Sequence, residues 1–250
     1  MNVSIFHDMT CKLPLPGLLE GVANIIRTDE KLAVFTRSYR QTGSKTFKNE
    51  SQLFSVACLF EGGKGRSNIR QLTGMSLVDF DHVFPTDSTD NSNALRELKA
   101  KIIADPHTLM SYITMSGNGL RVIFTYEIAP EFSGVPKDEE EVKKFEAYYQ
   151  QAFYAGNAYY EKLLGAKADM QCKNITRLSG LAHDPDVFLR PEAEVVPFTA
   201  EEISTAATAY AKQSKEDKQM QRIQTYFDTL IAPQLAKAKI EFRSGRHNEY

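Results

Sequence analysis

The chain has 250 residues, of which 42% are hydrophobic and 25% are charged, which is enough to build one large domain or two small ones. Thirty basic and 32 acidic residues leave a net charge of −2, so a contact with nucleic acid requires a local basic patch rather than an overall positive field. The three cysteines form no C-x-x-C pair, and no signal peptide or long apolar run is present, which together predict a protein of the reducing cytoplasm with no membrane span.

The first third of the chain contains a predicted strand, two helices and a buried strand. Residues 2–7 alternate as a strand does, and apolar residues recur at helical spacing over 16–29, with a second helix at 29–41. A buried strand is expected at 53–60. The glycine-rich basic loop that follows, at 61–68, lacks the spacing of a Walker A loop.

The next strand, within SLVDFDHV, carries two aspartates. Because residues i and i+2 of a strand point to one face, Asp79 and Asp81 would project together, with Cα atoms roughly 7 Å apart. Two carboxylates this close repel each other unless a positive charge lies between them, and Mg²⁺ prefers such oxygen ligands. The alternative is a strand end whose acids are simply solvated, with His82 beginning a loop.

The remaining elements are a helix, a hairpin, a long helix, short extended pieces and a final helix. They follow a polar linker at 85–93. The first helix is expected at 94–105, the hairpin strands at 108–115 and 120–126, the long helix at 137–165, the extended pieces at 175–183 and 187–190, and the final helix at 199–234. Thr199 and Glu202 have the spacing of a capping box at the start of the last helix.

The turn of the hairpin lies in SGNGLRVIF, residues 116–124. Its glycines allow a tight turn with exposed backbone N–H groups, which can hold a phosphate. Arg121 begins the second strand on the face opposite Leu120 and Val122, where its guanidinium could pair with a phosphate. The alternative is a plain hairpin with a surface arginine, because such turns are common.

Two further segments contain candidate polar residues. Asp169 follows the long helix, and Lys173 and Arg177 come shortly after it. The run His-Asp-Pro-Asp at 183–186 could suggest metal ligands, but an Asp-Pro step favours an ordinary turn. The segment 61–70 contains three basic residues, Lys64, Arg66 and Arg70. Their side chains either neutralise phosphates or remain solvated.

The order of these motifs resembles the archaeo-eukaryotic primase superfamily of primase-polymerases. DFDH, SGNGLR and CKNITRLSGLAHDPDVFLRP are most similar to the VirE N-terminal-type primase-like domain of bacterial mobile elements. The resemblance covers roughly residues 50–200. The final FRSGRHNEY resembles the start of the helical module that often follows such domains, so we expect the natural chain to continue past residue 250.

The resemblance implies a metal-dependent nucleotidyl-transfer centre. Asp79, Asp81 and Asp169 would be the catalytic and metal-binding acids for Mg²⁺ or Mn²⁺. The side chains expected to hold nucleotide phosphates are those of Ser116, Gly117, Arg121, Arg177 and Arg66. Arg121 stands where many primases have histidine; arginine keeps the phosphate contact but cannot act as a neutral base.

The implied function is a primase-like nucleotidyltransferase of a DNA replication or mobilisation protein, which makes or extends primers on single-stranded DNA from nucleoside triphosphates. One alternative is a catalytically inactive module that binds nucleic acid or nucleotide and works with a helicase domain in the same or a neighbouring chain. Another is a metal-dependent nuclease, although no strand carries the D/E-x-K pattern that many nucleases use.

The expected fold is α+β, with a primase-polymerase-like core at 1–198 and a helical extension at 199–250. The strands at 76–81, 108–115 and 120–126 should be neighbours in a mixed or antiparallel sheet. The long helix should pack on this sheet through aromatic residues, namely Phe145, Tyr148, Tyr149 and Phe153.

Overall fold

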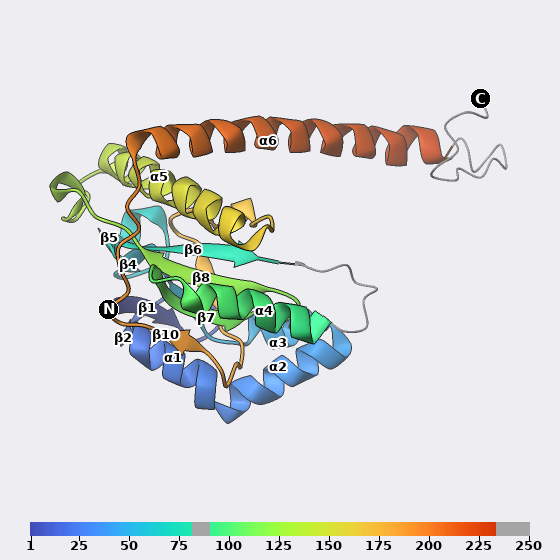
Figure 1. Ribbon diagram of the computed structural model, residues 1–250, viewed down its shortest axis with the longest axis horizontal. Helices are drawn as coiled ribbons and strands as arrows, with labels where there is room; N and C mark the ends of the chain where they lie inside the picture. Colours follow the sequence, from blue (N-terminus) through green and yellow to red (C-terminus); the bar gives the residue numbers. More distant parts are fainter. Residues whose placement is uncertain (82–90, 234–250) are drawn as a thin grey trace. The chain divides into compact units, whose positions relative to one another are not determined.

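The computed structural model describes residues 1–81 and 91–233, and the chain forms two compact units, residues 1–204 and 205–250. The elements are β1 Asn2–Phe6, β2 Leu15–Leu18, α1 Leu19–Thr28, α2 Glu30–Thr42, α3 Lys45–Asn49, β3 Leu53–Ser55, β4 Cys58–Phe60, η1 Arg66–Asn68, β5 Ile69–Leu72, β6 Met75–Phe80, α4 Asn91–Ala104, β7 Thr108–Ile113, β8 Leu120–Thr125, η2 Pro130–Phe132, α5 Glu139–Leu164, η3 Met170–Lys173, β9 Leu178–Gly180, β10 Phe188–Leu189, α6 Ala200–Tyr226 and a π-helical turn Phe227–Ile231 (Figure 1). The fold is α+β, as predicted.

The central sheet of the first unit has the strand order β10-β7-β8-β6. β8 pairs with β7 on one side and with β6 on the other, so the three strands predicted to be neighbours are neighbours. All pairs in this sheet are antiparallel. The short turn between β7 and β8 forms the expected hairpin.

α4 and α5 pack against this central sheet. α5 starts at Asp138, whose carboxylate accepts a hydrogen bond from the Glu141 amide at 2.8 Å, and it ends at a left-handed glycine. The aromatic contacts predicted for this helix are confirmed, since Phe145, Tyr149 and Phe153 are buried. Tyr148 is half-buried and packs against the same core.

Glycine at position 156 lets α5 approach the sheet closely. A Cβ atom there would lie 2.0 Å from Cζ of Phe124 on β8, so a larger residue would push the helix away. Phe124 therefore faces α5. Because side chains alternate along a strand, Arg121 and Ile123 point to the other face of the sheet.

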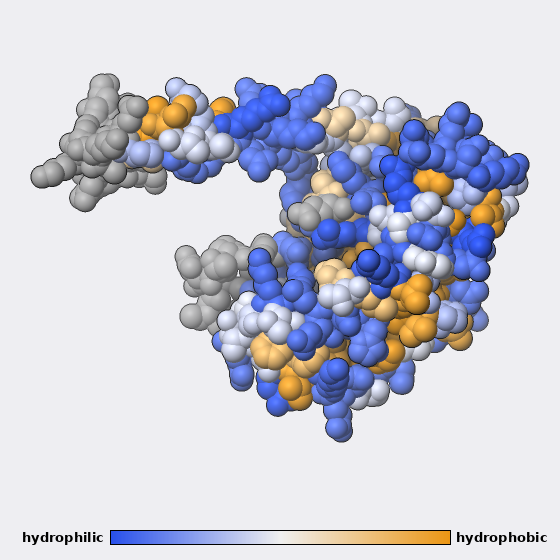
Figure 2. Space-filling model, turned by 180° about the vertical axis from the view of Figure 1, so that it is seen from behind, coloured by the Kyte–Doolittle hydropathy of each residue, from blue (hydrophilic) through white to orange (hydrophobic). Residues whose placement is uncertain are grey.

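A second sheet, with the order β2-β1-β3-β9, brings together the beginning and the end of the first unit. β9 pairs with β3 in the register Leu53↔Gly180, and β3 pairs with β1. Val3, Phe6 and Phe54 from this sheet are buried in the same core as the central sheet. On the face seen in Figure 2, hydrophobic side chains lie in small separate groups among hydrophilic ones.

Several boundaries differ from the prediction. The buried strand expected at 53–60 is interrupted at Val56 and Ala57, where the Ala57 carbonyl accepts from the Thr73 amide at 3.1 Å, and it forms two strands in different sheets. The helix expected from residue 16 begins at Leu19, because 15–18 pairs with β1 as β2. The short elements α3 and β5 were not predicted.

The beginning of the last helix agrees with the prediction. The Glu202 carboxylate accepts from the Thr199 amide and hydroxyl, each at 2.8 Å, and the Thr199 hydroxyl accepts from the Glu202 amide at 3.2 Å. The capping box is thus confirmed. None of the described helices has the length and apolar character that crossing a membrane requires. His82, most of the linker at 85–93 and the segment 242–250 lie outside the described residues.

Candidate functional site

The candidate site is built around a charged pair on neighbouring strands. Asp79 on β6 is directly opposite Arg121 on β8 in the strand register. Arg121 donates from Nε at 3.2 Å and from Nη2 at 3.1 Å to the same oxygen, Oδ2 of Asp79. Both side chains are almost fully shielded, with exposed fractions of 5% for Asp79 and 14% for Arg121.

This arrangement corrects one expectation from the sequence. Asp79 was predicted to expose its carboxylate beside that of Asp81, with a metal ion offsetting their repulsion. Asp79 is instead buried, and a cross-strand guanidinium already compensates its charge. The pattern D-x-D could not reveal this, because the compensating arginine lies 42 residues further along the chain.

Arg121 also joins the two sheets of the first unit. Its Nη1 donates to the Gly180 carbonyl at 2.7 Å and to Ser179 Oγ at 3.0 Å, both on β9, and lies 3.4 Å from the Tyr112 hydroxyl. Burial by itself would lower the pKa of Arg121, but the Asp79 charge and the contacts with Tyr112 outweigh it, so the pKa lies well above its ordinary value. Arg121 is a fixed cation that holds Asp79 in place.

The second oxygen of Asp79 is in a different situation. Oδ1 is buried and accepts no hydrogen bond from any residue in 1–81 or 91–233. Leaving a buried acceptor unsatisfied costs roughly 1–3 kcal/mol, and more when the group is charged. A carboxylate that is held firmly by one oxygen and left without a partner on the other is suited to receive a further cation or donor.

Asp81 lies just beyond the end of β6 and is exposed, unlike Asp79. It lies close to Gly119: a Cβ at that position would be 3.2 Å from Oδ1 of Asp81 and 2.4 Å from the carbonyl oxygen of Phe80. The glycine therefore lets the end of β6 approach the hairpin turn. Asp81 is adjacent to that turn, not part of the buried pair.

Asp169 is held beside Asp79 through the backbone. Its amide donates to the Asp79 carbonyl at 2.7 Å, which ties the segment after α5 to β6. The charges of the same residues act on the buried thiol of Cys172: its pKa is raised to about 12, mainly by burial, with Asp79 and Asp169 also raising it and Arg121 and Arg177 lowering it. Four of the predicted site residues therefore influence one thiol electrostatically.

The predicted phosphate loop is an ordered turn. Ser116 Oγ lies 3.0 Å from the Thr114 hydroxyl and accepts from the Asn118 amide at 3.3 Å. Gly117 has a φ of 79°, a left-handed conformation that glycine adopts without strain. The turn is half-exposed and accessible.

Arg40, which was not among the residues predicted from the sequence, lies against this turn. From α2, its Nε donates to the Met115 carbonyl and its Nη2 to the Thr114 carbonyl, both at 3.3 Å. A Cβ on Gly117 would lie 3.0 Å from its Nε, so the guanidinium and the turn are in direct contact. Arg40 precedes the turn by 75 residues, and only the tertiary structure brings them together.

The basic residues of the glycine-rich loop are engaged elsewhere. Arg66, predicted to contact phosphate, forms an ion pair with Glu146 on α5 at 2.6 Å. Lys64 donates to a backbone carbonyl at 2.8 Å, and Arg70 pairs with Glu61. No contact of these three cations with the described residues connects this loop with the Asp79–Arg121 pair.

The segment 183–186, considered as a source of metal ligands, forms a structural ion pair. Asp184 Oδ2 accepts from Lys99 Nζ at 2.6 Å and from the Ile113 amide at 2.9 Å, and Oδ1 accepts from the Asp186 amide at 3.0 Å. Within the part of the chain that the structure describes, no group of three or more His, Cys, Asp or Glu side chains could hold a metal ion by itself.

Three residues that contact Arg121 were not predicted as part of the site, although two of them lie within the sequence motifs. Ser179 and Gly180 lie within the RLSG segment used for the resemblance, but no role was given to them. Tyr112 was placed only as part of a strand. A possible signal for these residues is that a buried arginine needs several acceptors, which strand-end hydroxyls and carbonyls supply.

Comparison with known proteins gives one match. No curated protein and no solved structure matches the chain. The family described as "BT4734-like, N-terminal domain" matches residues 46–189, which is more than half of the chain and includes β6, β8, β9 and the Asp79–Arg121 pair. The chain therefore belongs to the BT4734-like N-terminal domain family.

Proposed function

We propose that this domain binds a nucleoside triphosphate together with Mg²⁺ or Mn²⁺ and acts in nucleotidyl transfer, as a primase-like domain of a DNA replication or mobilisation protein. The observation that carries the proposal is the unsatisfied, buried Oδ1 of Asp79. Two further acids support the proposal: Asp81 directly follows the same strand, and the Asp169 amide is hydrogen-bonded to the Asp79 carbonyl.

The described residues fit a metal that is shared with a ligand. Mg²⁺ usually keeps several waters and binds through one or two carboxylates plus substrate phosphates, so a cage of three protein ligands is not required. Asp79 would provide the inner carboxylate through Oδ1, and Asp81 and Asp169 are the nearest further acids in the sequence motifs. A metal bound there would neutralise phosphate charge and support displacement at a phosphorus atom.

The protein's own residues contribute position and charge. Arg121 fixes the Asp79 carboxylate with two hydrogen bonds to one oxygen, which leaves the other oxygen in a defined direction. The Ser116–Asn118 turn supplies a compact polar surface next to Asp81. The sequence-based assignment of Arg121 as a direct phosphate contact becomes, in this proposal, a role in positioning Asp79.

A second candidate is a non-catalytic binding module, and one observation favours it. All three nitrogens of Arg121 already bond to protein acceptors, so the strongest cation of the site is not available for a transferring phosphate. Such a domain would bind nucleotide or nucleic acid without performing chemistry. A metal-dependent nuclease would use the same acids on a different bond.

The test of binding is calorimetric titration of a non-hydrolysable nucleoside triphosphate in the presence of Mn²⁺. We expect the wild type to bind and Asp79→Asn to bind at least tenfold more weakly, because amide oxygen is a poorer ligand than carboxylate. Glu146→Gln is the matched control: it removes a partly buried carboxylate that is ion-paired with Arg66 and makes no described hydrogen bond to Asp79 or Arg121, and its affinity should equal that of the wild type. Equal affinity of Asp79→Asn and wild type would refute the site.

Incubation with a labelled single-stranded template separates the candidate activities. Incorporation of nucleotides, on a bare or a primed template, supports the nucleotidyltransferase. Binding without incorporation supports the non-catalytic module, and shortening of the labelled strand supports the nuclease. Incorporation or shortening of the strand should disappear in Asp79→Asn.

A further inference from the structure

α2 and α3 are mainly basic, with Glu30 at the start of α2 as their one acid. From Lys31 to Lys48 the sequence contains five basic residues and no acidic residue, although the whole chain has a net charge of −2. We refer to these side chains as the α2–α3 surface; they are Lys31, Arg37, Arg40, Lys45 and Lys48. A local patch of this kind is what a nearly neutral protein needs in order to attract a polyanion.

The cations of the α2–α3 surface are exposed and form no ion pair with a described acid, although the charge of Asp184 acts on Arg40. All five residues are exposed, and none forms an ion pair with a carboxylate of the described chain. On α5, by contrast, Lys143 and Lys144 each lie within ion-pairing distance of a glutamate one turn earlier, at 3.8 and 3.5 Å. The α5 lysines are balanced within the protein, whereas the α2–α3 cations are left for an external partner.

Aromatic rings lie among these cations. Phe35, Tyr39 and Phe47 are half-buried, the rings of Phe35 and Phe47 are 5.8 Å apart, and Lys31 Nζ lies 5.2 Å from the centre of the Phe35 ring. Cations that follow a phosphate backbone, combined with rings that can contact unpaired bases, are typical of surfaces that bind single strands. Neither a membrane surface nor an acidic protein requires this interleaving.

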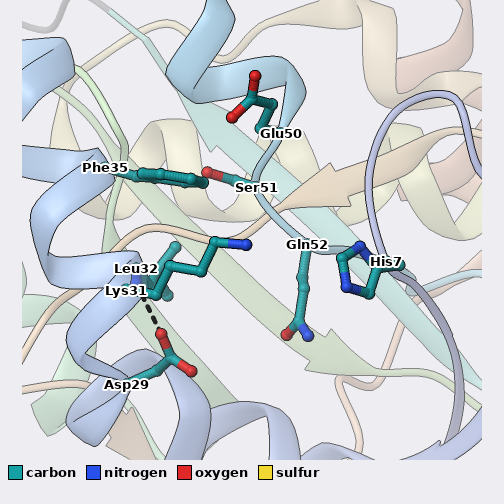
Figure 3. Close-up of a pocket in the computed structure, with 8 residues that line it drawn as sticks. All are labelled: His7, Asp29, Lys31, Leu32, Phe35, Glu50, Ser51 and Gln52. Carbon is teal, nitrogen blue, oxygen red and sulfur yellow. Dashed lines mark hydrogen bonds between the residues drawn. The ribbon is translucent and has the colours of Figure 1, made fainter.

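A small pocket opens at the Phe35 end of the surface. Its volume is about 100 Å³, and Lys31, Phe35 and Gln52 are among the residues that line it. In Figure 3 the Lys31 amine points toward Gln52, with the Phe35 ring on one side. The acids Asp29 and Glu50 also line the pocket, and Gln52 Oε1 is buried without a partner among the described residues, so a donor such as a base amino group would satisfy it.

The other end of the surface reaches the candidate site. Arg40 contacts the carbonyls of Thr114 and Met115 and lies against Gly117 in the turn beside Asp81. Its Nη1 has no acceptor among residues 1–81 and 91–233, so a part of the guanidinium remains available to a phosphate. A chain of phosphates lying on α2 and α3 would therefore meet the turn at Arg40.

We propose that the α2–α3 surface binds the phosphate backbone of a single-stranded nucleic acid and leads it past Arg40 to the 116–118 turn. The inference rests on the proposed function for its biological meaning, but it makes a separate physical claim. The binding would be mainly electrostatic, because the cations carry it, and it would show little preference between DNA and RNA.

The experiment measures fluorescence anisotropy of labelled oligodeoxythymidine and oligouridine at several salt concentrations. The α2–α3 variant carries Gln at four positions, Arg37, Arg40, Lys45 and Lys48. The control variant carries Gln at four other positions, Lys137, Lys143, Lys144 and Lys162. Both variants change the net charge by the same amount, and all eight residues are exposed. Each lost phosphate contact should reduce the slope of log affinity against log salt by about 0.7.

We expect the α2–α3 variant to bind at least tenfold more weakly at low salt, with the slope reduced by up to about 3, while the control changes less than twofold. Equal weakening in both variants would mean that only net charge matters, and it would overturn the proposal, as would wild-type affinity in the α2–α3 variant. Tighter binding to a duplex of the same length would overturn the single-strand assignment. A third variant changes only Arg37, Lys45 and Lys48, so that the contacts of Arg40 with the turn are kept. It should show roughly three quarters of the slope reduction of the four-residue variant.

Failure here and failure of the proposed function are distinguishable. The variant that retains Arg40 should bind nucleoside triphosphate with Mn²⁺ as the wild type does, and Asp79→Asn should bind the oligonucleotide as the wild type does. A wild type that binds nucleotide but no oligonucleotide overturns this inference alone.

Discussion

Among the described residues of the first unit two ion pairs are buried, and their carboxylates are satisfied to different degrees. Asp184 accepts hydrogen bonds on both oxygens, from Lys99 and from two backbone amides. Asp79 accepts from Arg121 on one oxygen, and its other oxygen has no described partner. The two carboxylates are equally buried, at 3% and 4% exposure.

The difference separates a structural ion pair from a candidate functional one. A buried charge is expensive unless its partners satisfy it fully, and the Lys99–Asp184 pair meets that condition. The Asp79–Arg121 pair does not, although its arginine is fully engaged. Burial and charge alone would have selected both pairs; the unsatisfied oxygen selects only one.

The largest expected effect is on the complete pair. Lys99→Met should lower the free energy of unfolding by about 3–5 kcal/mol, because it leaves Asp184 buried with no cation. Urea unfolding followed by circular dichroism measures the loss. Lys101→Met, an exposed position on the same helix, is the control and should change stability by less than about 0.5 kcal/mol. Similar losses in both variants would contradict the structural role of the pair.

Removing the acid of the Asp79–Arg121 pair should lower the free energy of unfolding by a smaller amount. Asp79→Asn should cost about 1–3 kcal/mol of unfolding free energy, since Arg121 keeps the Gly180 carbonyl and Ser179 as acceptors. Asp184→Asn, measured in the same urea series, should lose more. The reverse order would remove the distinction between the two pairs.

Thiol labelling reports on the packing around the Asp79–Arg121 pair. Burial raises the pKa of Cys172 and of Cys58 to about 12. At pH 8 only about one in ten thousand of each thiol is therefore ionised to the reactive thiolate. Cys11 is half-exposed and should be the one thiol that reacts rapidly with a maleimide. In Asp79→Asn we expect Cys172 to label faster than in the wild type while Cys58 stays protected, as mass spectrometry of peptides can establish. Unchanged protection of both would show that the pair does not maintain the packing.

The smallest effect concerns a carboxylate that is satisfied but exposed. Asp8 accepts from the Thr10 hydroxyl and amide and from the Cys11 amide, and these hydrogen bonds lower its pKa from 3.8 to about 2. Because the folded pKa is depressed, the stabilisation is present above pH 3.8 and is lost as the pH falls toward 2. The stability difference between wild type and Asp8→Asn should therefore shrink over this interval. An NMR titration of Asp8 with a midpoint near 4 would contradict the contacts.

Local patterns were sufficient to predict much of the central fold. The β7–β8 hairpin follows from its glycine turn, and α5 follows from its acidic start and aromatic spacing. The sequence did not predict β5 or α3, because elements of four and five residues carry too little periodic signal. The break at Val56 was also missed, since a continuous apolar run does not reveal where a strand changes sheets.

The candidate site was predicted in its residues but not in its contacts. Asp79, Asp169 and Arg121 were selected, and the structure brings them together. That Arg121 bonds to Asp79 depends on the register between β6 and β8, which no local pattern fixes. Arg40 depends on the packing of α2 against a distant turn, although the run of cations without an acid was visible in the sequence.

The second sheet has a consequence for how the family domain can be isolated. The family match starts at residue 46, after β1 and β2, although β1 pairs along the whole of β3. A fragment limited to residues 46–189 would leave β3 as an open edge and would uncover the core that Val3 and Phe6 close. Exposed edge strands of this kind recruit other chains, so such a fragment should aggregate during expression, whereas a fragment that begins at residue 1 should not.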